Sequence, residues 1–306
     1  MSERWVRGVS LAVVFVMLFA APVLAADPYA EARRDAQHRI NVSGRQRMLS
    51  QRIAKAACLA TRSPENGEQL REMFDAQALF VSSAKALRSG STEIKLAPEQ
   101  EADLLPVLEE ATQLASQYDA AVNALAAAFP AKPYQEKLEA IYELSLPVLS
   151  GLNDAVEQLE TKHEDGHLIR PGLANALNVS GRQRMLSQKM SKELCMLASG
   201  YKPQETRAHM RGTVALFVSS HERLKRGLMQ MALNEKDASA ISSQLALIER
   251  HWRELGNIFV RVSEGGDPSE DDVKTVALGS KTLLAELNHA VELYEVIDIV
   301  SAGSKQ

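Results

Sequence analysis

The sequence has few aromatic residues, few cysteines and no excess of basic charge. Aromatic residues make up 5% of the 306 residues, which is low for a β-sandwich or barrel and favours a helical fold. Two cysteines are too few for a disulfide-rich scaffold or a four-cysteine zinc site. Lys and Arg number 35 against 39 Asp and Glu, and this net charge of −4 argues against nucleic acid as a partner.

Only one long apolar run occurs, and it lies at the start of the sequence. Arg4 and Arg7 precede the run, which ends in small residues around Ala25. This arrangement is typical of a secretory signal peptide, so we expect cleavage to remove residues 1–26; the alternative is an uncleaved membrane anchor. No other stretch is long and apolar enough to span a membrane. We therefore expect the mature chain to be soluble in the periplasm.

Sequence motifs for catalysis, metal binding and cofactor binding are absent. There is no glycine-rich phosphate loop, nucleophile elbow or haem-attachment motif. The seven His residues form no His-x-x-x-His pair, so we predict neither a metal site nor a cofactor. Because no nucleophile–base pair is recognisable, we expect a binding or interaction protein rather than an enzyme.

The two halves of the sequence repeat each other. Asn41–Gln51 recurs without a change as Asn178–Gln188, 137 positions later, and Ala78–Ser83 recurs as Ala215–Ser220 at the same offset. A structural repeat needs only similar apolar positions. Identity across polar residues therefore indicates that these side chains have a shared role.

Each repeat shows the periodicity of α-helices and none of the alternation of strands. Prolines near the expected starts and glycines near the expected ends set the boundaries. Helices are predicted over residues 28–62, 63–90, 98–129 and 133–163, and then over 171–199, 203–226, 235–263 and 268–301. The sequence thus predicts an all-α chain of two tandem up-down four-helix bundles that form a pseudo-two-fold pair. The predicted units are a first bundle over 27–163, a linker over 164–170 and a second bundle over 171–302.

The repeated motif lies on the first helix of each unit and has two faces. One stripe is largely apolar, for example at Val42, Leu49 and Ile53, and is expected to face its own bundle. The opposite stripe contains Gly44 and Arg47. A glycine inside a helix costs about 1 kcal/mol relative to alanine, which indicates a close approach of another helix. The alternative for this second stripe is a solvated polar face.

The topology allows the first helices of the two units to meet. Four antiparallel helices return the chain to the end where it began, so the two first helices can lie parallel, with Arg47 facing Arg184. Two facing arginines in a partly dry interface repel each other unless an anion lies between them; the alternative is a surface ion pair for each. We predict one anion site shared by both units. The predicted ligand-binding residues are Arg47, Arg184, Gly44, Gly181, Ser43, Ser180, Gln51 and Gln188.

The two cysteines occupy equivalent positions on the same stripe, 11 residues after the arginines. An exported compartment permits a disulfide between Cys58 and Cys195, provided that their Cα atoms approach within about 7 Å. The alternative is a pair of free cysteines that act as small apolar residues.

The repeated motif resembles that of a known family. Residues 40–52 (Ile-Asn-x-Ser-Gly-x-x-Arg-Met-x-Ser-Gln-Arg) resemble the first-helix signature of the type IV pilus methyl-accepting chemotaxis transducer N-terminal (PilJ-type) domain. They are also similar to the P-box of NarX/NarQ-type nitrate sensor kinases. In those kinases one nitrate binds at the axis of a dimer of periplasmic four-helix bundles, between the P-box arginines. By the motif, these correspond to Arg47 and Arg184, and the preceding glycines to Gly44 and Gly181.

The resemblance implies a sensory function. We predict a periplasmic binding module for a small oxyanion, with nitrate or nitrite first, whose state is read by a membrane chemoreceptor or sensor kinase. The chain would be a monomer with an internal pseudo-dimer, or a homodimer if the units pair between chains. The alternative is a helical adaptor without a small ligand, which pairs with a PilJ-type receptor or with a second copy of the chain.

Overall fold

The computed structural model describes residues 28–62, 67–129, 134–165, 169, 171–231 and 233–303. Over these ranges the chain forms eight α-helices and no strand, which confirms the predicted all-α class. The predicted signal peptide, residues 1–26, lies outside the described residues. None of the described helices is long and apolar enough to cross a membrane.

The first four helices pack on one another in chain order. They are α1 (Pro28–Arg62), α2 (Gly67–Ser89), α3 (Leu105–Ala128) and α4 (Gln135–Asp165). Helix α1 packs against α2 and α4, and α3 packs against the same two helices. This is the closed arrangement of an up-down four-helix bundle.

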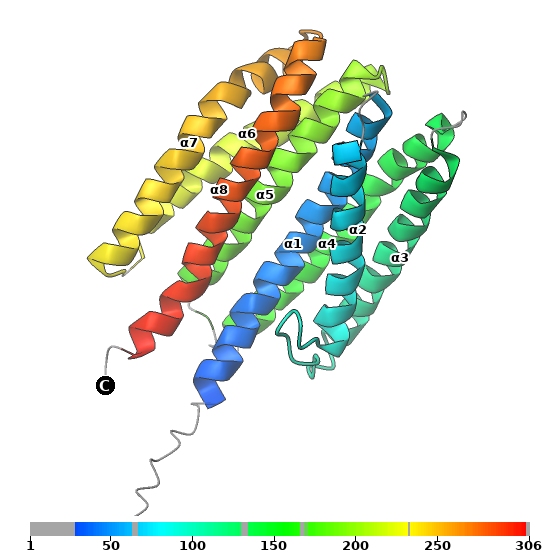
Figure 1. The fold of residues 1–306 in the computed structure, drawn as a ribbon. Coiled ribbons are helices and arrows are strands. Elements are labelled where there is room, and N and C mark those ends of the chain that lie inside the picture. Colours follow the sequence, from blue (N-terminus) through cyan, green and yellow to red (C-terminus); the bar gives the residue numbers. More distant parts are fainter. Residues whose placement is uncertain are drawn as a thin grey trace, which may run out of the picture.

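The last four helices repeat this arrangement. They are α5 (Pro171–Ala198), α6 (Pro203–Leu228), α7 (Glu235–Ser263) and α8 (Glu270–Gly303). Helix α5 packs against α6 and α8, and α7 packs against the same two. The start of α1 and the end of α8 lie at the same end of the molecule (Figure 1).

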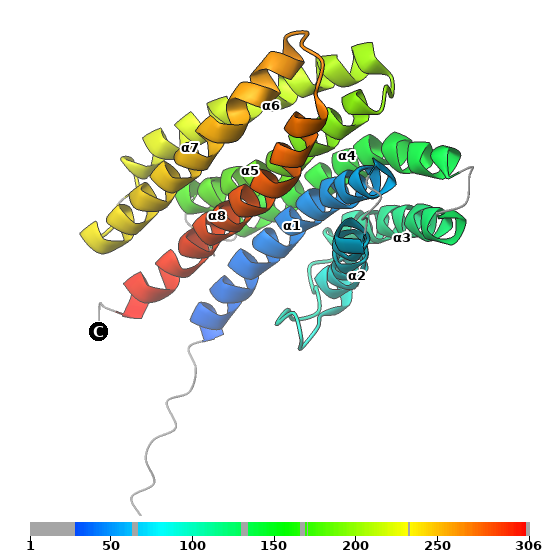
Figure 2. The same cartoon turned by 45° about the horizontal axis from the view of Figure 1, so that its top comes forward.

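The two four-helix units are joined along α1 and α5, which pack against each other at the centre of the molecule. In both views α2 and α3 lie on one side of this pair, and α6 and α7 lie on the other (Figures 1 and 2). Helix α1 is therefore covered on two faces. Leu49 and Ile53 are fully buried, as are the small residues Ala54, Ala57 and Cys58. Small side chains let two helix backbones approach closely.

The structure corrects the predicted start of the third helix. The sequence predicted a helix from Pro98, but α3 begins at Leu105, with Pro106 in its first turn. The segment before it is held by a long-range contact, because buried Arg39 of α1 donates a hydrogen bond to the carbonyl oxygen of Ala97 at 2.7 Å. Local sequence does not reveal such a contact. The other helix ends lie within about one turn of their predicted positions.

Candidate functional site

Helices α1 and α5 bring equivalent residues of the two repeats together. Cys58 and Cys195 are joined by a disulfide, and their Cα atoms lie 6.2 Å apart. One turn further along, Arg62 donates a hydrogen bond to the carbonyl oxygen of Ala198 at 2.7 Å. The two helices are therefore parallel and in register, and the stripes that carry the repeated arginines face each other.

The glycines of these stripes leave room for two guanidinium groups. A Cβ atom built on Gly44 would lie 3.5 Å from Nη2 of Arg47 and 3.6 Å from Nη2 of Arg184. For Gly181 the corresponding distances are 3.5 Å to Arg184 and 3.6 Å to Arg47. Both guanidinium groups therefore lie against both glycines, between the two helices.

Each guanidinium group reaches across into the other repeat. Nη2 of Arg47 donates to Oδ1 of Asn178 at 3.0 Å, and Nη2 of Arg184 donates to Oδ1 of Asn41 at 2.9 Å. The same two Nη2 atoms also approach the backbone oxygens of these asparagines, at 3.4 and 3.3 Å. The crossed pattern repeats across a pseudo-two-fold axis.

The remaining contacts of the guanidinium groups are weaker and stay within one repeat. Nη1 of Arg47 donates to Oδ1 of Asn153 on α4 at 3.3 Å. Nη1 of Arg184 lies 3.5 Å from Oδ1 of Asn288 on α8, at the limit of a hydrogen bond. Among the described residues, all acceptors of these two side chains are neutral asparagine oxygens.

Carboxylates lie one step beyond the asparagines. Asn41 Nδ2 donates to Oε2 of Glu295 at 2.5 Å, and Asn178 Nδ2 donates to Glu160. Each asparagine thus presents its oxygen to an arginine and its amide nitrogen to an acid. We call these two chains of contacts the Arg–Asn–Glu relays; one ends at Glu160 on α4 and the other at Glu295 on α8.

The two arginines are buried cations with incomplete compensation. Arg47 is 1% exposed and Arg184 is 3% exposed. Burial, together with the charges of Arg182 and Arg184, lowers the pKa of Arg47 to about 9. Burial, followed by the charge of Arg45, lowers the pKa of Arg184 to about 10. The Nε atom of each is buried without a hydrogen-bond partner among the described residues. This environment favours a bound anion, because an anion offsets the desolvation cost of both cations.

A cleft leads to one side of the arginine pair. Its volume is about 560 Å³, and its wall includes Arg47 together with Asn153 of α4, Asn178 of α5 and Arg223 of α6. A small solute can therefore approach Arg47 between α4, α5 and α6.

The predicted glutamines make their hydrogen bonds away from the arginines. Oε1 of Gln51 accepts from Nζ of Lys192 at 2.8 Å, and its Nε2 donates to the carbonyl oxygen of Ser145 at 3.1 Å. Nε2 of Gln188 donates to Oγ of Ser187 at 3.2 Å. The structure therefore brings the arginines and glycines of the predicted site together, but it does not join the glutamines to them.

The predicted serines also make no hydrogen bond to the arginines. Ser43 and Ser180 are both buried. Ser180 donates to the carbonyl oxygen of Ala176 at 2.7 Å, one turn back in its own helix. This back-bonding satisfies the Ser180 hydroxyl within α5.

Lys192 is a buried residue that the sequence analysis missed. It reaches across from α5 to Gln51 and to Oγ of Ser145 at 3.0 Å, and burial lowers its pKa to about 7. The equivalent Lys55 instead pairs with Glu72 in its own unit at 2.7 Å. Position 209, which corresponds to Glu72, is a histidine, so Lys192 lacks that partner. The pseudo-symmetry is broken here.

The asparagines were also missed as site residues, although the sequence marks them. Asn41 and Asn178 open the repeated motif, and Asn153 and Asn288 stand at matched positions 135 residues apart. Identical polar residues at fixed spacing were the available signal. No group of three or more His, Cys, Asp or Glu within the described ranges could hold a metal ion.

One end of the relay to Arg184 is a pH-sensitive ion pair. Nδ1 of His38 lies 2.6 Å from Oε1 of Glu295, and Nε2 lies 2.7 Å from the carbonyl oxygen of Ile94. The hydrogen bond with Glu295 raises the pKa of His38, while burial and the charge of Arg45 oppose this rise. Both ring nitrogens face acceptors, which favours the imidazolium form.

We expect His38→Gln to remove a stabilisation that depends on pH. Because the pKa of folded His38 is raised, its contribution is fully present below its ordinary value of 6.5 and is lost as the pH rises through the folded value. The contribution is on the order of 1 kcal/mol for a partly exposed pair. Denaturant unfolding between pH 5 and 9 measures it, with His251→Gln as the control. Equal pH dependence of His38→Gln and the natural protein would contradict the assignment.

Both halves of the chain match the profile of one protein family. The profile of the type IV pili methyl-accepting chemotaxis transducer N-terminal domain, PilJ, matches residues 29–141 and residues 170–272. One match falls on each repeat. The chain belongs to the PilJ family. The resemblance of the motif to the PilJ-type domain is thereby confirmed for both repeats, whereas the similarity to the nitrate sensor kinases stays a prediction.

A relative of known class agrees with this assignment. This chain is 30% identical over 117 residues to the methyl-accepting chemotaxis protein McpN of Pseudomonas aeruginosa. The aligned part is 38% of this chain and 21% of McpN, so the chain spans about a fifth of that relative. No solved structure matches the chain. Membership of the PilJ family relates both repeats to the N-terminal domains of chemotaxis transducers.

Proposed function

We propose that this chain is an exported periplasmic module that binds one small oxyanion, nitrate or nitrite first, between Arg47 and Arg184. The observation that carries the proposal is the pair of buried guanidinium groups that share Gly44 and Gly181 without a carboxylate partner among the described residues. Residues 1–26 would act as the signal peptide that exports it. The function is binding and signalling rather than catalysis.

The chemistry of the pair suits a planar oxyanion. A guanidinium group is a planar fork that donates two parallel hydrogen bonds to such an anion. Binding would replace neutral asparagine oxygens by a charged acceptor, and hydrogen bonds to an ionised acceptor are roughly twice as strong. It would also remove the mutual repulsion of the two arginines, so the pKa of each would rise.

The Arg–Asn–Glu relays offer a route from the anion to the outer helices. When a guanidinium group turns toward the anion, its asparagine loses that contact, and the hydrogen bond to Glu160 on α4 or Glu295 on α8 must adjust. Both carboxylates lie on the last helix of their unit. A membrane chemoreceptor or sensor kinase would read a shift of α4 and α8.

Two units in one chain make the site independent of dimer formation. The covalent link gives each unit a high effective concentration of the other. We therefore expect one anion for each chain, with the chain acting as a monomeric pseudo-dimer. Two anions for each chain, or binding only at concentrations where the chain dimerises, would contradict this stoichiometry.

The second candidate function is an adaptor that binds no small ligand. One observation favours it: the asparagines of the Arg–Asn–Glu relays supply hydrogen-bond acceptors to both guanidinium groups from within the protein. In that case the arginines stabilise the α1–α5 interface, and the chain pairs with a PilJ-type receptor through other surfaces.

Calorimetric titration of the mature chain with nitrate distinguishes the two functions. Nitrite, sulfate and chloride serve as comparison anions. Saturable binding at one site for each chain, with nitrate or nitrite preferred, supports the oxyanion module. The absence of both heat and thermal stabilisation with every anion would refute it and support the adaptor.

Gly44→Ala is expected to separate stability from ligand binding. Alanine is better than glycine inside a helix by about 1 kcal/mol, so the variant should be somewhat more stable. Its Cβ would sit 3.5 and 3.6 Å from the two Nη2 atoms, in space that the anion needs. We expect nitrate affinity to fall at least tenfold.

The matched control for this variant is Gly212→Ala. Gly212 lies within α6, and a Cβ there would meet no atom within 4 Å. The Gly212→Ala variant should raise stability to a similar extent and leave nitrate affinity unchanged. Thermal unfolding and calorimetry measure both quantities. Unchanged nitrate affinity in Gly44→Ala would place the anion elsewhere.

A further inference from the structure

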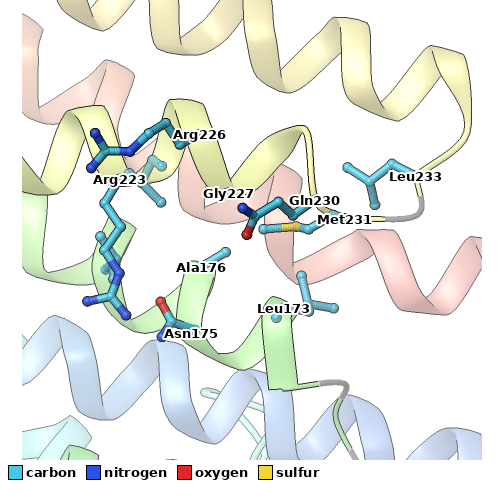
Figure 3. Close-up of a pocket in the computed structure, with 12 residues that line it drawn as sticks. Leu173, Asn175, Ala176, Arg223, Arg226, Gly227, Gln230, Met231 and Leu233 are labelled. Carbon is cyan, nitrogen blue, oxygen red and sulfur yellow. The ribbon is translucent and has the colours of Figure 1, made fainter.

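A hollow in the second unit lies apart from the arginine pair. It has a volume of about 650 Å³ and lies between the start of α5, the end of α6 and the residues that follow α6. This volume is within the range of small-molecule sites. Figure 3 shows Arg223 and Arg226 on one side of the hollow and Leu173, Met231 and Leu233 on the other. One side is thus cationic and the other apolar.

The first unit fills the equivalent space with its own side chain. Arg39, 137 positions before Ala176, is 2% exposed and donates to the carbonyl oxygens of Leu87 and Ala97, each at 2.7 Å. It also pairs with Asp35 at 2.9 Å. In the second unit the arginine is replaced by Ala176, which removes the side chain that would fill the hollow.

The connection between the second and third helices of each unit also differs, and this difference enlarges the hollow. In the first unit, 15 residues join α2 to α3, and buried Leu96 and Leu104 lie within that segment. In the second unit only six residues join α6 to α7. A shorter connection and a smaller side chain together account for the open space.

The charge of the second unit also differs at this place. Asp35 is replaced by Gly172, whereas Ala86 and Ser89 are replaced by Arg223 and Arg226. Neither Arg223 nor Arg226 makes a hydrogen bond or ion pair with a described residue. Relative to the first unit, one acid (Asp35) and one base (Arg39) have been lost and two exposed bases gained around an apolar hollow, a net gain of positive charge, so the electrostatic preference is for an anion.

We propose that this hollow is a second ligand site, for an aliphatic carboxylate. The carboxylate group lies against Arg223, and the apolar chain extends over Ala176 toward Met231 and Leu233. The site is independent of the oxyanion site, although Arg223 also lines the cleft that reaches Arg47. An amphipathic ligand fits better than an inorganic anion because most of the lining is apolar.

Calorimetry of the disulfide-bonded mature chain with butanoate, hexanoate and octanoate tests the proposal. Each buried methylene contributes about 0.8 kcal/mol, so two added methylenes should tighten binding roughly tenfold. Octanoate should bind at one site for each chain. 1-Octanol and octylammonium have the same apolar chain without the negative charge, and they should bind at least tenfold more weakly.

Three variants assign the site. Ala176→Arg restores the residue of the first unit, and Ala176→Leu fills the hollow with less change; each should abolish octanoate binding. Arg223→Gln should weaken it about tenfold. Arg253→Gln on α7, which lies outside the hollow, should leave it unchanged. Thermal unfolding and helical circular dichroism establish that each variant is folded.

The outcomes decide the proposal. Loss of binding in folded Ala176→Leu or Ala176→Arg, with retention in Arg253→Gln, supports it. Octanoate binding that survives both substitutions at Ala176 would overturn it, as would equal affinity for octanol and octanoate or no saturable binding of any carboxylate. Because Ala176 does not line the cleft that reaches Arg47, nitrate binding is a separate readout for the two Ala176 variants.

Discussion

Arg47→Met and Arg184→Met are each expected to reduce nitrate affinity at least about 100-fold. Truncating one partner of a buried charge-assisted pair typically costs 2–5 kcal/mol or more. Each side chain supplies one of the two guanidinium groups that lie against Gly44 and Gly181, so neither can replace the other. Methionine keeps most of the side-chain volume and removes the charge.

The same substitutions should leave the ligand-free protein folded. Replacing a buried charge by an apolar side chain of similar volume is often neutral or stabilising, and each substitution also removes one of two repelling cations. We therefore expect an unfolding temperature close to that of the natural protein in buffer without anions. The increase that nitrate causes in the natural protein should be absent from both variants.

Arg250→Met is the control for these experiments. Arg250 is exposed on α7 and does not line the cleft that reaches Arg47, so this variant should bind nitrate like the natural protein. Retained nitrate affinity in either Arg47→Met or Arg184→Met would refute a site shared by the two repeats. Affinity lost in only one of them would instead place the anion within a single unit.

The helical architecture could be predicted because it depends on local patterns. Apolar residues at helical spacing and repeated positions 137 residues apart gave the helices and their tandem order. The start of α3 could not be predicted this way. A proline at position 98 is an ordinary helix start, but the contact between Arg39 and the carbonyl oxygen of Ala97 joins residues 58 positions apart and exists only in the packed bundle. Tertiary contacts overrode the local preference.

The arrangement of the candidate site was predictable for its charged residues but not for their neutral hydrogen-bond partners. The identity of the polar motif in the two repeats pointed to Arg47, Arg184 and the glycines. Gln51 was expected beside them, but it accepts a hydrogen bond from Lys192 instead. The reason is the direction of helical side chains, which point toward the N-terminus of their own helix. Arg47 therefore reaches back to Asn178, an earlier turn of α5, rather than forward to Gln188.

Removing the Cys58–Cys195 disulfide is expected to be the substitution with the largest effect on stability. The bond closes a loop of 137 residues. In the chain-entropy model, closing a loop of this length lowers the entropy of the unfolded chain and so raises its free energy by about 5 kcal/mol at 25 °C. For a protein of this size, 1 kcal/mol corresponds to a few degrees, so the unfolding temperature should fall by roughly 10 °C or more.

The double variant Cys58→Ser, Cys195→Ser tests this expectation without a reactive thiol. Its unfolding should be compared with that of the oxidised and the reduced natural protein. The reduced protein and the double variant should unfold alike, and both should unfold well before the oxidised protein. If all three unfold at the same temperature, the bond does not stabilise the folded chain.

Nitrate binding by the double variant then shows what the disulfide does for the arginine pair. Cys58 lies 11 residues, or about three turns, beyond Arg47 on the same face of α1. The bond therefore fixes the register of α1 against α5 at one end and leaves the arginine end free to adjust. If the disulfide serves only to set the register of α1 against α5, the packing of these two helices should maintain that register at low temperature without the bond. Nitrate affinity should then change less than threefold. A larger loss would mean that the covalent bond itself holds the two guanidinium groups in place for the anion.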